Sequence, residues 1–207
     1  MMNILHLRAI SHELPAFVQA LEARGIASRS VRDLCADDLR ASQVLLIEAH
    51  IDQKALLGMK DGLMDCLNAG GTIVFNGHLV YPLIDGLEPF QVAAGRGRDD
   101  LVVERVHTHP VFEGVDCQDL SFRRGVAGFY ARGANPPPAD AQVLHRLKQD
   151  GSPIDWVWQR PEGGQVFMHS GNTMWMYLND KSSAARIAPQ LLDWVCASAP
   201  ELTEEAH

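Results

Sequence analysis

Histidines placed directly after apolar segments are the residues of this sequence best suited to proton transfer. The apolar run "TIVF" leads into Asn76, Gly77 and His78, and the run "QVLLI" leads into Glu48 and His50. The imidazole pKa lies near neutrality, so His78 and His50 are candidates for general acid–base catalysis, with the Glu48 or Asp52 carboxylate orienting one ring. Asn76 and the Gly77 backbone would then contact a polar ligand. The same Asn-Gly pair also suits a turn with positive φ, which is the structural alternative.

Three further candidates follow other apolar segments. His12 comes after the first run, "NILHL", and His169 and Asn172 surround the end of the later run "QVFM". We predict that these three side chains contribute to ligand binding. Each candidate also has a structural explanation, because loop histidines are often only exposed, and Glu48 or Asp52 would complement the N-terminus of a following helix.

Short apolar runs alternate with helical periodicity through the first half of the chain. Strands are expected at 3–7, 26–31, 43–47 and 72–75, and the longest of the intervening helices is expected at 53–68. This order predicts an α/β fold of three layers, with a flavodoxin-like, mostly parallel sheet and helices on both faces. Ligands of such sheets bind beyond the carboxyl ends of the strands, so we expect the candidate loops to meet in one crevice.

The second half of the chain is less regular. Alternating and apolar runs predict strands at 101–106, 142–147, 154–159 and 165–169, and a closing helix at 183–197. These segments would extend the same sheet.

Length and composition are those of one globular domain. The 207 residues are 46% hydrophobic and 21% charged, and we predict a single α/β domain over 1–198 followed by a polar tail over 199–207. The net charge of −8 disfavours nucleic acid and anionic membranes as partners. No signal peptide or membrane-spanning run is recognised, and the four dispersed cysteines are expected as reduced thiols, so the predicted localisation is cytoplasmic.

Other chemistries lack their sequence patterns. No H-E-x-x-H or comparable spacing accompanies the nine histidines, so we predict no metal site. The G-x-S-x-G elbow and its cysteine version are absent, and Cys66 is expected as a packed thiol on a helix. The glycines within 95–98 do not connect a strand to a helix, as those of a phosphate-binding loop would. No cofactor is predicted.

The order of several short motifs resembles the class I glutamine amidotransferase-like family. The motifs are "NAGGTIVFNGH", "HPVFEGV", "GGQVFMHSGN" and a final helix ending "DWVCA", and they are most similar to the trehalose-utilisation, or ThuA-like, branch. The resemblance covers about residues 3–197 and implies a flavodoxin-like fold. The amidotransferase elbow reads G-x-C-x-G and its late motif ends in His-Pro-Glu. Here the elbow reads Phe-Asn-Gly-His, and His169, which matches the family histidine, is followed by Ser-Gly. The resemblance therefore implies a centre that has lost its thiol and its carboxylate.

Two functional hypotheses follow. In the first, the domain is not a glutaminase and binds a small polar, carbohydrate-related molecule or a protein partner at the strand carboxyl ends. In the second, it is an enzyme that acts on a sugar or related polar metabolite through histidine and carboxylate acid–base chemistry. The sequence leaves a homo-oligomer open. Aromatic residues expected near the rim fit the first hypothesis, although such residues are also common in cores. They are Phe129, Tyr130, Trp156, Trp158, Trp175 and Tyr177.

Overall fold

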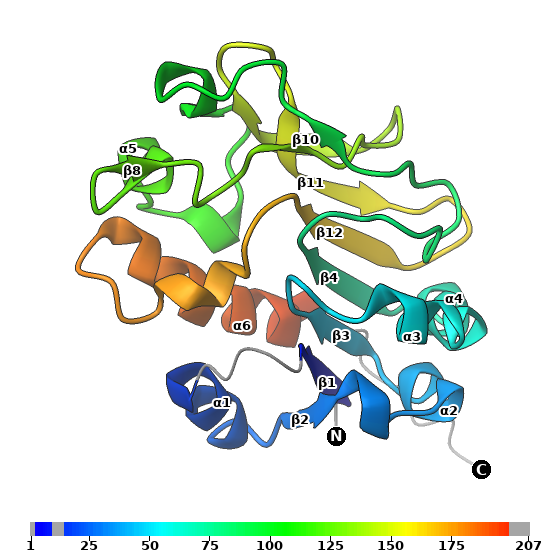
Figure 1. Cartoon of the computed structure of the whole chain (residues 1–207). Coiled ribbons are helices and arrows are strands. Elements are labelled where there is room, and N and C mark those ends of the chain that lie inside the picture. The colour runs from blue at the N-terminus through cyan, green and yellow to red at the C-terminus, as the bar shows by residue number, and fades with distance from the viewer. Residues whose placement is uncertain (1–2, 10–14, 199–207) are drawn as a thin grey trace.

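An eight-stranded sheet in the order β2-β1-β3-β4-β12-β11-β10-β6 forms the centre of the computed structural model, which describes residues 3–9 and 15–198 (Figure 1). The neighbouring strands β2, β1, β3, β4 and β12 are parallel, whereas β11, β10 and β6 continue the sheet in antiparallel pairs. The parallel part has the strand order of flavodoxin-like proteins. The predicted α/β fold is confirmed. The strands are β1 (Ile4–Arg8), β2 (Ala27–Ser30), β3 (Val44–Ile47), β4 (Thr72–Asn76), β6 (Val103–Arg105), β10 (Gln142–Leu147), β11 (Pro153–Gln159) and β12 (Gln165–His169).

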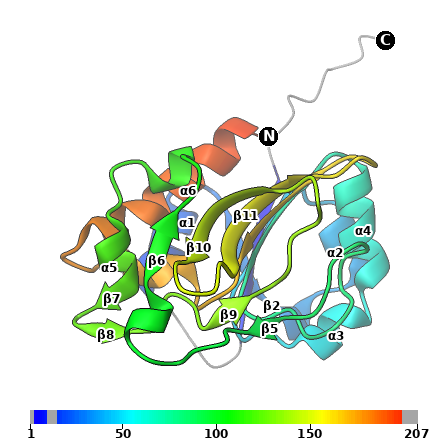
Figure 2. The same ribbon diagram turned by 90° about the horizontal axis from the view of Figure 1, so that it is seen from above.

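Helices cover both faces of this sheet, which gives the predicted three layers. Helices α1 and α6 lie on one face, and α2, α3 and α4 lie on the other (Figures 1 and 2). Two small antiparallel sheets, β5 with β9 and β7 with β8, lie along the lower edge of the view in Figure 2. The helices are α1 (Pro15–Glu22), α2 (Ala36–Arg40), α3 (Gln53–Leu57), α4 (Lys60–Asn68), α5 (Cys117–Ser121) and α6 (Ile187–Ser198). The short strands are β5 (Gln91–Val92), β7 (Phe122–Arg123), β8 (Val126–Ala127) and β9 (Gly133–Ala134).

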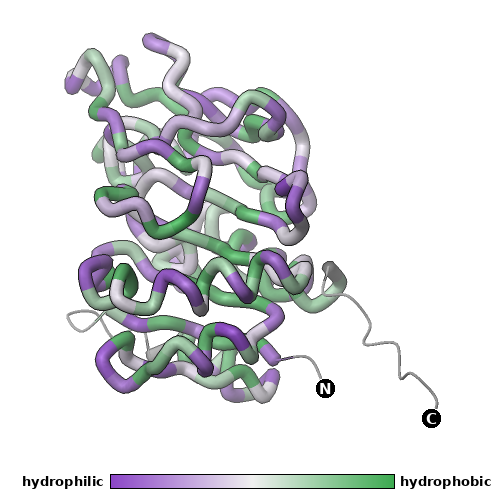
Figure 3. Tube along the Cα trace, turned by 90° about the vertical axis from the view of Figure 1, so that its right-hand side faces the viewer, coloured by the Kyte–Doolittle hydropathy of each residue, from purple (hydrophilic) through white to green (hydrophobic). Residues whose placement is uncertain are grey.

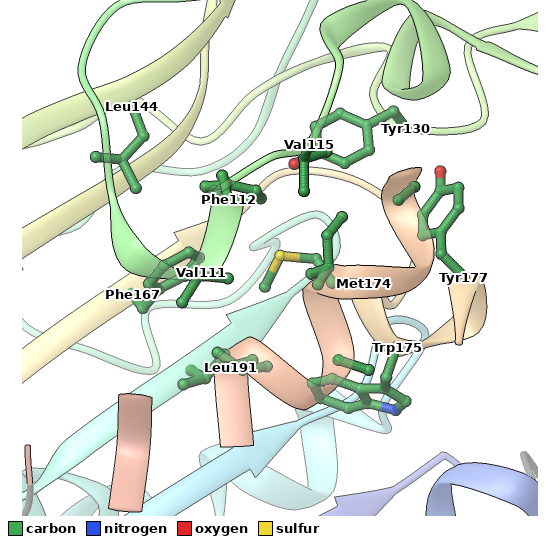
Figure 4. Close-up of a cluster of buried hydrophobic side chains, with 14 of the residues drawn as sticks. Val111, Phe112, Val115, Tyr130, Leu144, Phe167, Met174, Trp175, Tyr177 and Leu191 are labelled. Carbon is green, nitrogen blue, oxygen red and sulfur yellow. The ribbon is translucent and has the colours of Figure 1, made fainter. Parts of the chain in front are cut away.

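Alternation along the buried strands divides the core between the two faces. In β3, Leu46 belongs to the cluster beneath α6, and Leu45 belongs to the cluster beneath α3 and α4. Figure 4 shows the first cluster, in which Phe112, Phe167 and Leu191 lie close to one another. The hydropathy-coloured trace of Figure 3 has apolar residues along the central strands. Burial on both faces explains why these strands read as continuous apolar runs.

The long helix expected at 53–68 is interrupted, which corrects the prediction. Helix α3 ends at Leu57 and α4 begins at Lys60. Between them the Met59 amide donates to the Leu56 carbonyl three residues back, at 2.9 Å, instead of continuing the α-helical ladder. Gly58 occupies the break, and glycine is about 1 kcal/mol less favourable in a helix than alanine. The expected final helix is likewise divided, because a 3₁₀ turn, Ser183–Arg186, precedes α6.

Several other expectations concern the whole chain. All four cysteines are free thiols, as predicted. Within the part of the chain that the structure describes, no helix is both long and apolar enough to span a membrane. The single-domain organisation over 1–198 stays a prediction, and the expected tail over 199–207 lies outside the described residues.

Candidate functional site

Loops that follow β3, β4 and β12 meet a fourth loop, 128–132, around a pocket at the carboxyl edge of the sheet. We call it the carboxyl-end pocket, and its volume is about 440 Å³. This is the position that the α/β rule predicts for a ligand. The lining residues are His50, Gln53, Gly77, His78, Val80, Gly128, Phe129, Ala131, Arg132, Gly171 and Asn172.

His78 lies flat against an aromatic ring at one side of this pocket. Its ring centroid is 3.6 Å from that of Phe90, with 13° between the planes. The His78 carbonyl accepts a hydrogen bond from Gln53 Nε2 at 2.6 Å. Burial lowers the pKa of His78, and the charges of His50 and His169 lower it further. The ring is therefore neutral at pH 7, a form that can accept a proton or a hydrogen bond from a ligand.

His50 and Asn172 lie next to each other in the lining of the pocket. His50 Nε2 lies 3.4 Å from Asn172 Oδ1, and the Asn172 amide nitrogen donates to the Phe129 carbonyl at 2.8 Å. His50 has a φ of 64°, a left-handed conformation that is unusual for a residue with a side chain. The fold thus brings together His50, His78 and Asn172, three of the predicted site residues, from three different loops.

Asn76 takes a different place from the one expected. Its side chain is fully buried, donates to the Ile47 carbonyl at 2.8 Å and accepts from the Met174 amide at 3.0 Å. These bonds join the end of β4 to β3 and to the segment after β12. The structure therefore corrects the expectation of ligand contact, because both polar ends of the Asn76 side chain bind the backbone.

Gly77 lies in the wall of the pocket and has a backbone that glycine suits best. Its φ is 104°, and a Cβ there would lie 3.2 Å from Ala49 Cα. Its amide donates to the His169 carbonyl at 2.9 Å. Positive φ and close approach to the loop after β3 both favour glycine at this turn. Gly77 therefore lines the pocket, and its contact with a ligand stays a prediction.

Glu48 turns away from the pocket histidines, which corrects its expected role. It is buried, Oε1 lies 3.2 Å from His6 Nε2 without the angle of a hydrogen bond, and Oε2 accepts from the Ala9 amide at 2.8 Å. His6 is held on its other side by Ser28 Oγ at 2.8 Å and contacts the ring of Trp175. Glu48 thus pairs with a histidine of β1, and the expected orientation of His50 or His78 by this carboxylate is wrong.

Two other predicted residues have simpler outcomes. Asp52 accepts from the Ala55 amide at 3.1 Å and caps α3, which is the structural alternative weighed from the sequence. His12 lies outside the described residues.

His169 belongs to a buried network centred on Asp155. His169 Nδ1 lies 2.6 Å from Asp155 Oδ1, and Asp155 Oδ2 accepts from Tyr130 Oη at 2.7 Å and lies 2.9 Å from His145 Nδ1. Burial alone would raise the pKa of Asp155, but the charge on His169 and the hydrogen bonds from both histidines outweigh it and hold this pKa well below its usual range. Burial also raises the pKa of Tyr130, which stays a hydrogen-bond donor. The Asp155 carboxylate is therefore ionised, and Tyr130, His145 and His169 satisfy it with hydrogen bonds.

This network reaches to just below the carboxyl-end pocket. His169 is fully buried, and its Nε2 has no hydrogen-bond partner among the described residues. A Cβ placed on Gly171 would lie 3.0 Å from His169 Nε2 and would overlap the Tyr130 carbonyl oxygen. Gly171 is therefore the thin layer between His169 and the pocket. His169 supports the pocket from beneath and does not line it.

Sequence reasoning missed Asp155 and Asn135. Asp155 pairs directly with His169 across β11 and β12, and its one signal is a carboxylate within the apolar alternation "IDWVW". Asn135 Oδ1 accepts from the Leu79 amide at 2.8 Å, and its Nδ2 donates to the Gly77 carbonyl at 2.8 Å. Asn135 precedes three prolines that indicate only a rigid loop. It holds the turn that carries His78.

The aromatic residues expected at a rim are mostly core residues. Phe129 is partly exposed and lines the pocket. The other five are buried: Tyr130, Trp156, Trp158, Trp175 and Tyr177. Five of the six are therefore core residues, which is the structural alternative considered from the sequence.

Residues 3–9 and 15–198 contain no group of three or more His, Cys, Asp or Glu side chains with the arrangement of a metal site.

No model of a protein family matches the chain, and no curated protein matches its sequence.

Solved structures do share the fold. A protein assigned as a GMP synthase component, from Thermoplasma acidophilum, superposes with a TM-score of 0.59 and 12% identity, covering 99% of each chain. A ThuA-like protein from Bacteroides uniformis gives a TM-score of 0.52 and 14% identity, covering 94% of this chain and 91% of its own. The mmIFT52 N-terminal domain superposes with a TM-score of 0.55 and 15% identity, covering 99% of this chain and 100% of its own. The chain therefore has the fold of class I glutamine amidotransferase-like and ThuA-like proteins.

Proposed function

We propose that this protein binds a small polar molecule in the carboxyl-end pocket and does not hydrolyse glutamine. The observation that carries the proposal is the composition of that pocket. It brings His50, His78 and Asn172 together beside the turn after β4, and the turn itself reads Asn76-Gly77-His78 where amidotransferases have a cysteine. The turn has a φ of 104° at Gly77, and Asn76, Gly77 and His78 offer no hydroxyl or thiol nucleophile.

None of the four cysteines lines the carboxyl-end pocket. Cys66 of α4 is buried, and its Sγ lies 3.1 Å from the Ser42 carbonyl. Burial raises the pKa of Cys66 to about 12, so the reactive thiolate is not formed at neutral pH. Acyl-enzyme formation needs an activated nucleophile beside a base. Glutamine hydrolysis is accordingly not expected.

The lining chemistry favours a polar, carbohydrate-related ligand. Imidazole, amide and guanidinium groups from His50, Asn172 and Arg132 offer donors and acceptors, and Phe129 adds an exposed aromatic ring. A polar ligand with several hydroxyl groups would satisfy such a lining, and an aromatic ring packs on an apolar face of the ligand. Alternatively, the same edge of the sheet would bind a protein partner in place of a small molecule. We also propose a cytoplasmic localisation, as expected from the sequence.

The enzymatic alternative is favoured by one specific observation, which is that His78 is near the buried His169–Asp155 pair. His50 and His78 line the same pocket, and Gly171 in the wall of that pocket lies against His169. A neutral His78 suits the role of a general base towards a sugar hydroxyl. Against this role, the carboxylates expected to orient His50 or His78 are engaged elsewhere, Glu48 with His6 and Asp52 at the start of α3.

Ligand titration followed by nuclear magnetic resonance would test the proposal. Neutral mono- and disaccharides should shift the signals of residues around the pocket, and Asn172→Ala should weaken the effect at least about tenfold, since an amide that pairs with the ligand is lost. Asn179→Ala is the matched control outside the pocket. Release of ammonia from glutamine by the purified protein would refute the non-glutaminase part. Turnover of a sugar that His78→Ala abolishes would favour the enzyme.

A further inference from the structure

A second cavity adjoins the carboxyl-end pocket, and we call it the arginine cavity. Its volume is about 540 Å³, and it is lined by Arg96, Arg98 and Arg132 together with apolar side chains that include Phe90 and Val126. It shares His78 and Arg132 with the carboxyl-end pocket, so the two form adjoining compartments. Cavities of this size are typical of small-molecule sites.

The three arginines of this cavity differ from most others on the surface. Arg40, Arg123 and Arg146 each lie within hydrogen-bond distance of a carboxylate. Within the described part of the chain, Arg96, Arg98 and Arg132 make no ion pair, although the protein has 26 acidic side chains for 18 basic ones. Three guanidinium groups without an ion-pair partner around one cavity repel each other, and a bound anion would relieve that repulsion.

The local contacts leave these guanidinium groups able to bind a ligand. Arg132 Nε donates to the Gly128 carbonyl at 3.1 Å, which leaves its two terminal nitrogens for the cavity. Arg98 lies over the ring of Phe122, 4.7 Å from the centroid, a contact that uses the face of the guanidinium and leaves its edge. The nearby Asp100 carboxylate accepts from the Gly97 amide at 2.8 Å. The planar edge of a guanidinium fits carboxylate and phosphate oxygens in bidentate pairs.

The remainder of the lining is apolar and unusually exposed. Val92 of β5 is 57% exposed and Val126 of β8 is 51% exposed, and both line the cavity. Phe90, which stacks on His78, adds an aromatic ring to the same lining. Large apolar side chains gathered at a concave surface indicate contact with a ligand or partner. The apolar lining indicates that the anion carries an organic body.

We infer that the arginine cavity binds an organic anion, whose carboxylate or phosphate group pairs with Arg96, Arg98 and Arg132 and whose apolar body packs on Phe90 and Val126. The inference rests on the proposed function, because the same ligand would extend past His78 into the carboxyl-end pocket. The ligand class inferred here is narrower than that of the proposed function, since the ligand must carry a negative charge. A neutral sugar satisfies the carboxyl-end pocket but leaves the three arginines unpaired.

Calorimetric titration at low salt with phenyl phosphate, benzoate and benzyl alcohol would test the inference. The two anions should bind and the neutral alcohol should bind at least about tenfold more weakly, because it cannot form charge-assisted hydrogen bonds. Comparison of phenyl phosphate with benzoate shows which anionic group is preferred. Arg96→Gln/Arg98→Gln should weaken anion binding at least about tenfold. Arg24→Gln/Arg32→Gln is the control, because it removes the same charge at the β2 end of the sheet.

The outcomes separate this inference from the proposed function. Failure of both anions to bind, or equal losses in the two double variants, would overturn the arginine cavity as a specific site. If neutral sugars still bind in an Asn172-dependent way, the proposed function survives that failure. If anions bind through Arg96 and Arg98 while Asn172→Ala changes nothing for any ligand, the arginine cavity stands and the proposed function fails.

Discussion

Two groups of histidines in this protein share one edge of the sheet but differ in how they are held. His145 and His169 are fully buried and share the Asp155 carboxylate, and the register of β10, β11 and β12 places them on either side of it. His50 and His78 come from loops and line a pocket. The buried group therefore supports the fold, whereas the pocket group is the one that would contact a ligand under the proposed function.

Removal of Asp155 should have the largest effect, because it breaks the buried group. Asp155→Ala leaves three donors without their acceptor: the Tyr130 hydroxyl and the imidazoles of His145 and His169. Loss of one partner from a buried charged network costs about 3–5 kcal/mol, so the free energy of unfolding should fall by that amount. Chemical denaturation measures it. Asp193→Ala, at a carboxylate that is 72% exposed, is the control and should change stability by less than about 0.5 kcal/mol. Equal effects would show that the network is not structural.

Two asparagines extend the same comparison. Asn76→Ala leaves the Ile47 carbonyl and the Met174 amide buried without partners, and should cost about 2–3 kcal/mol of unfolding free energy. Asn172→Ala removes a partly exposed amide and should cost less than about 1 kcal/mol while it weakens ligand binding. Thermal melting and ligand titration of both variants give the two readouts. A stable Asn76→Ala protein with lost binding would reverse our assignment of the two residues.

His109 offers a smaller, pH-dependent contrast. Burial lowers the pKa of His109 to about 4, so the folded state prefers the neutral ring. The unfolded chain binds a proton near pH 6.5, and stability therefore falls as pH decreases from about 6.5 to about 4 and is unaffected by this group above that range. The loss should be about 2 kcal/mol after allowance for solvent screening.

His109→Asn is the variant that isolates this contribution. Asparagine can still accept from the Val111 amide, as His109 Nδ1 does at 3.3 Å, but it does not titrate. Urea denaturation at several pH values should show a shallower decline for the variant than for the natural protein. Parallel curves would exclude His109 as the cause, because the carboxylates contribute equally to both proteins.

The first half of the fold follows directly from sequence patterns, and the site does so only in part. Continuous apolar runs mark strands that are covered on both faces, and polar residues after them fall at the carboxyl edge. Periodicity does not show side-chain direction within a loop, so Glu48 was expected beside His50 and lies on His6 instead. The pairing of Asp155 with His169 depends on the register of antiparallel strands. That register is set by the type and length of the turn over 160–164, which its two glycines mark but do not define.

The smallest predicted effect concerns the backbone of His50, and it separates stability from binding. A left-handed conformation costs about 1 kcal/mol for a residue with a Cβ, and the φ of His50 is 64°. His50→Ala and His50→Gly both remove the imidazole, so both should lose ligand binding equally. Glycine has no such penalty at this φ, and the Gly variant should exceed the Ala variant by about 0.5–1 kcal/mol in unfolding free energy. Denaturation curves with ligand titrations would measure both quantities. Retained binding in both variants would remove His50 from the site, and a less stable Gly variant would contradict the left-handed backbone.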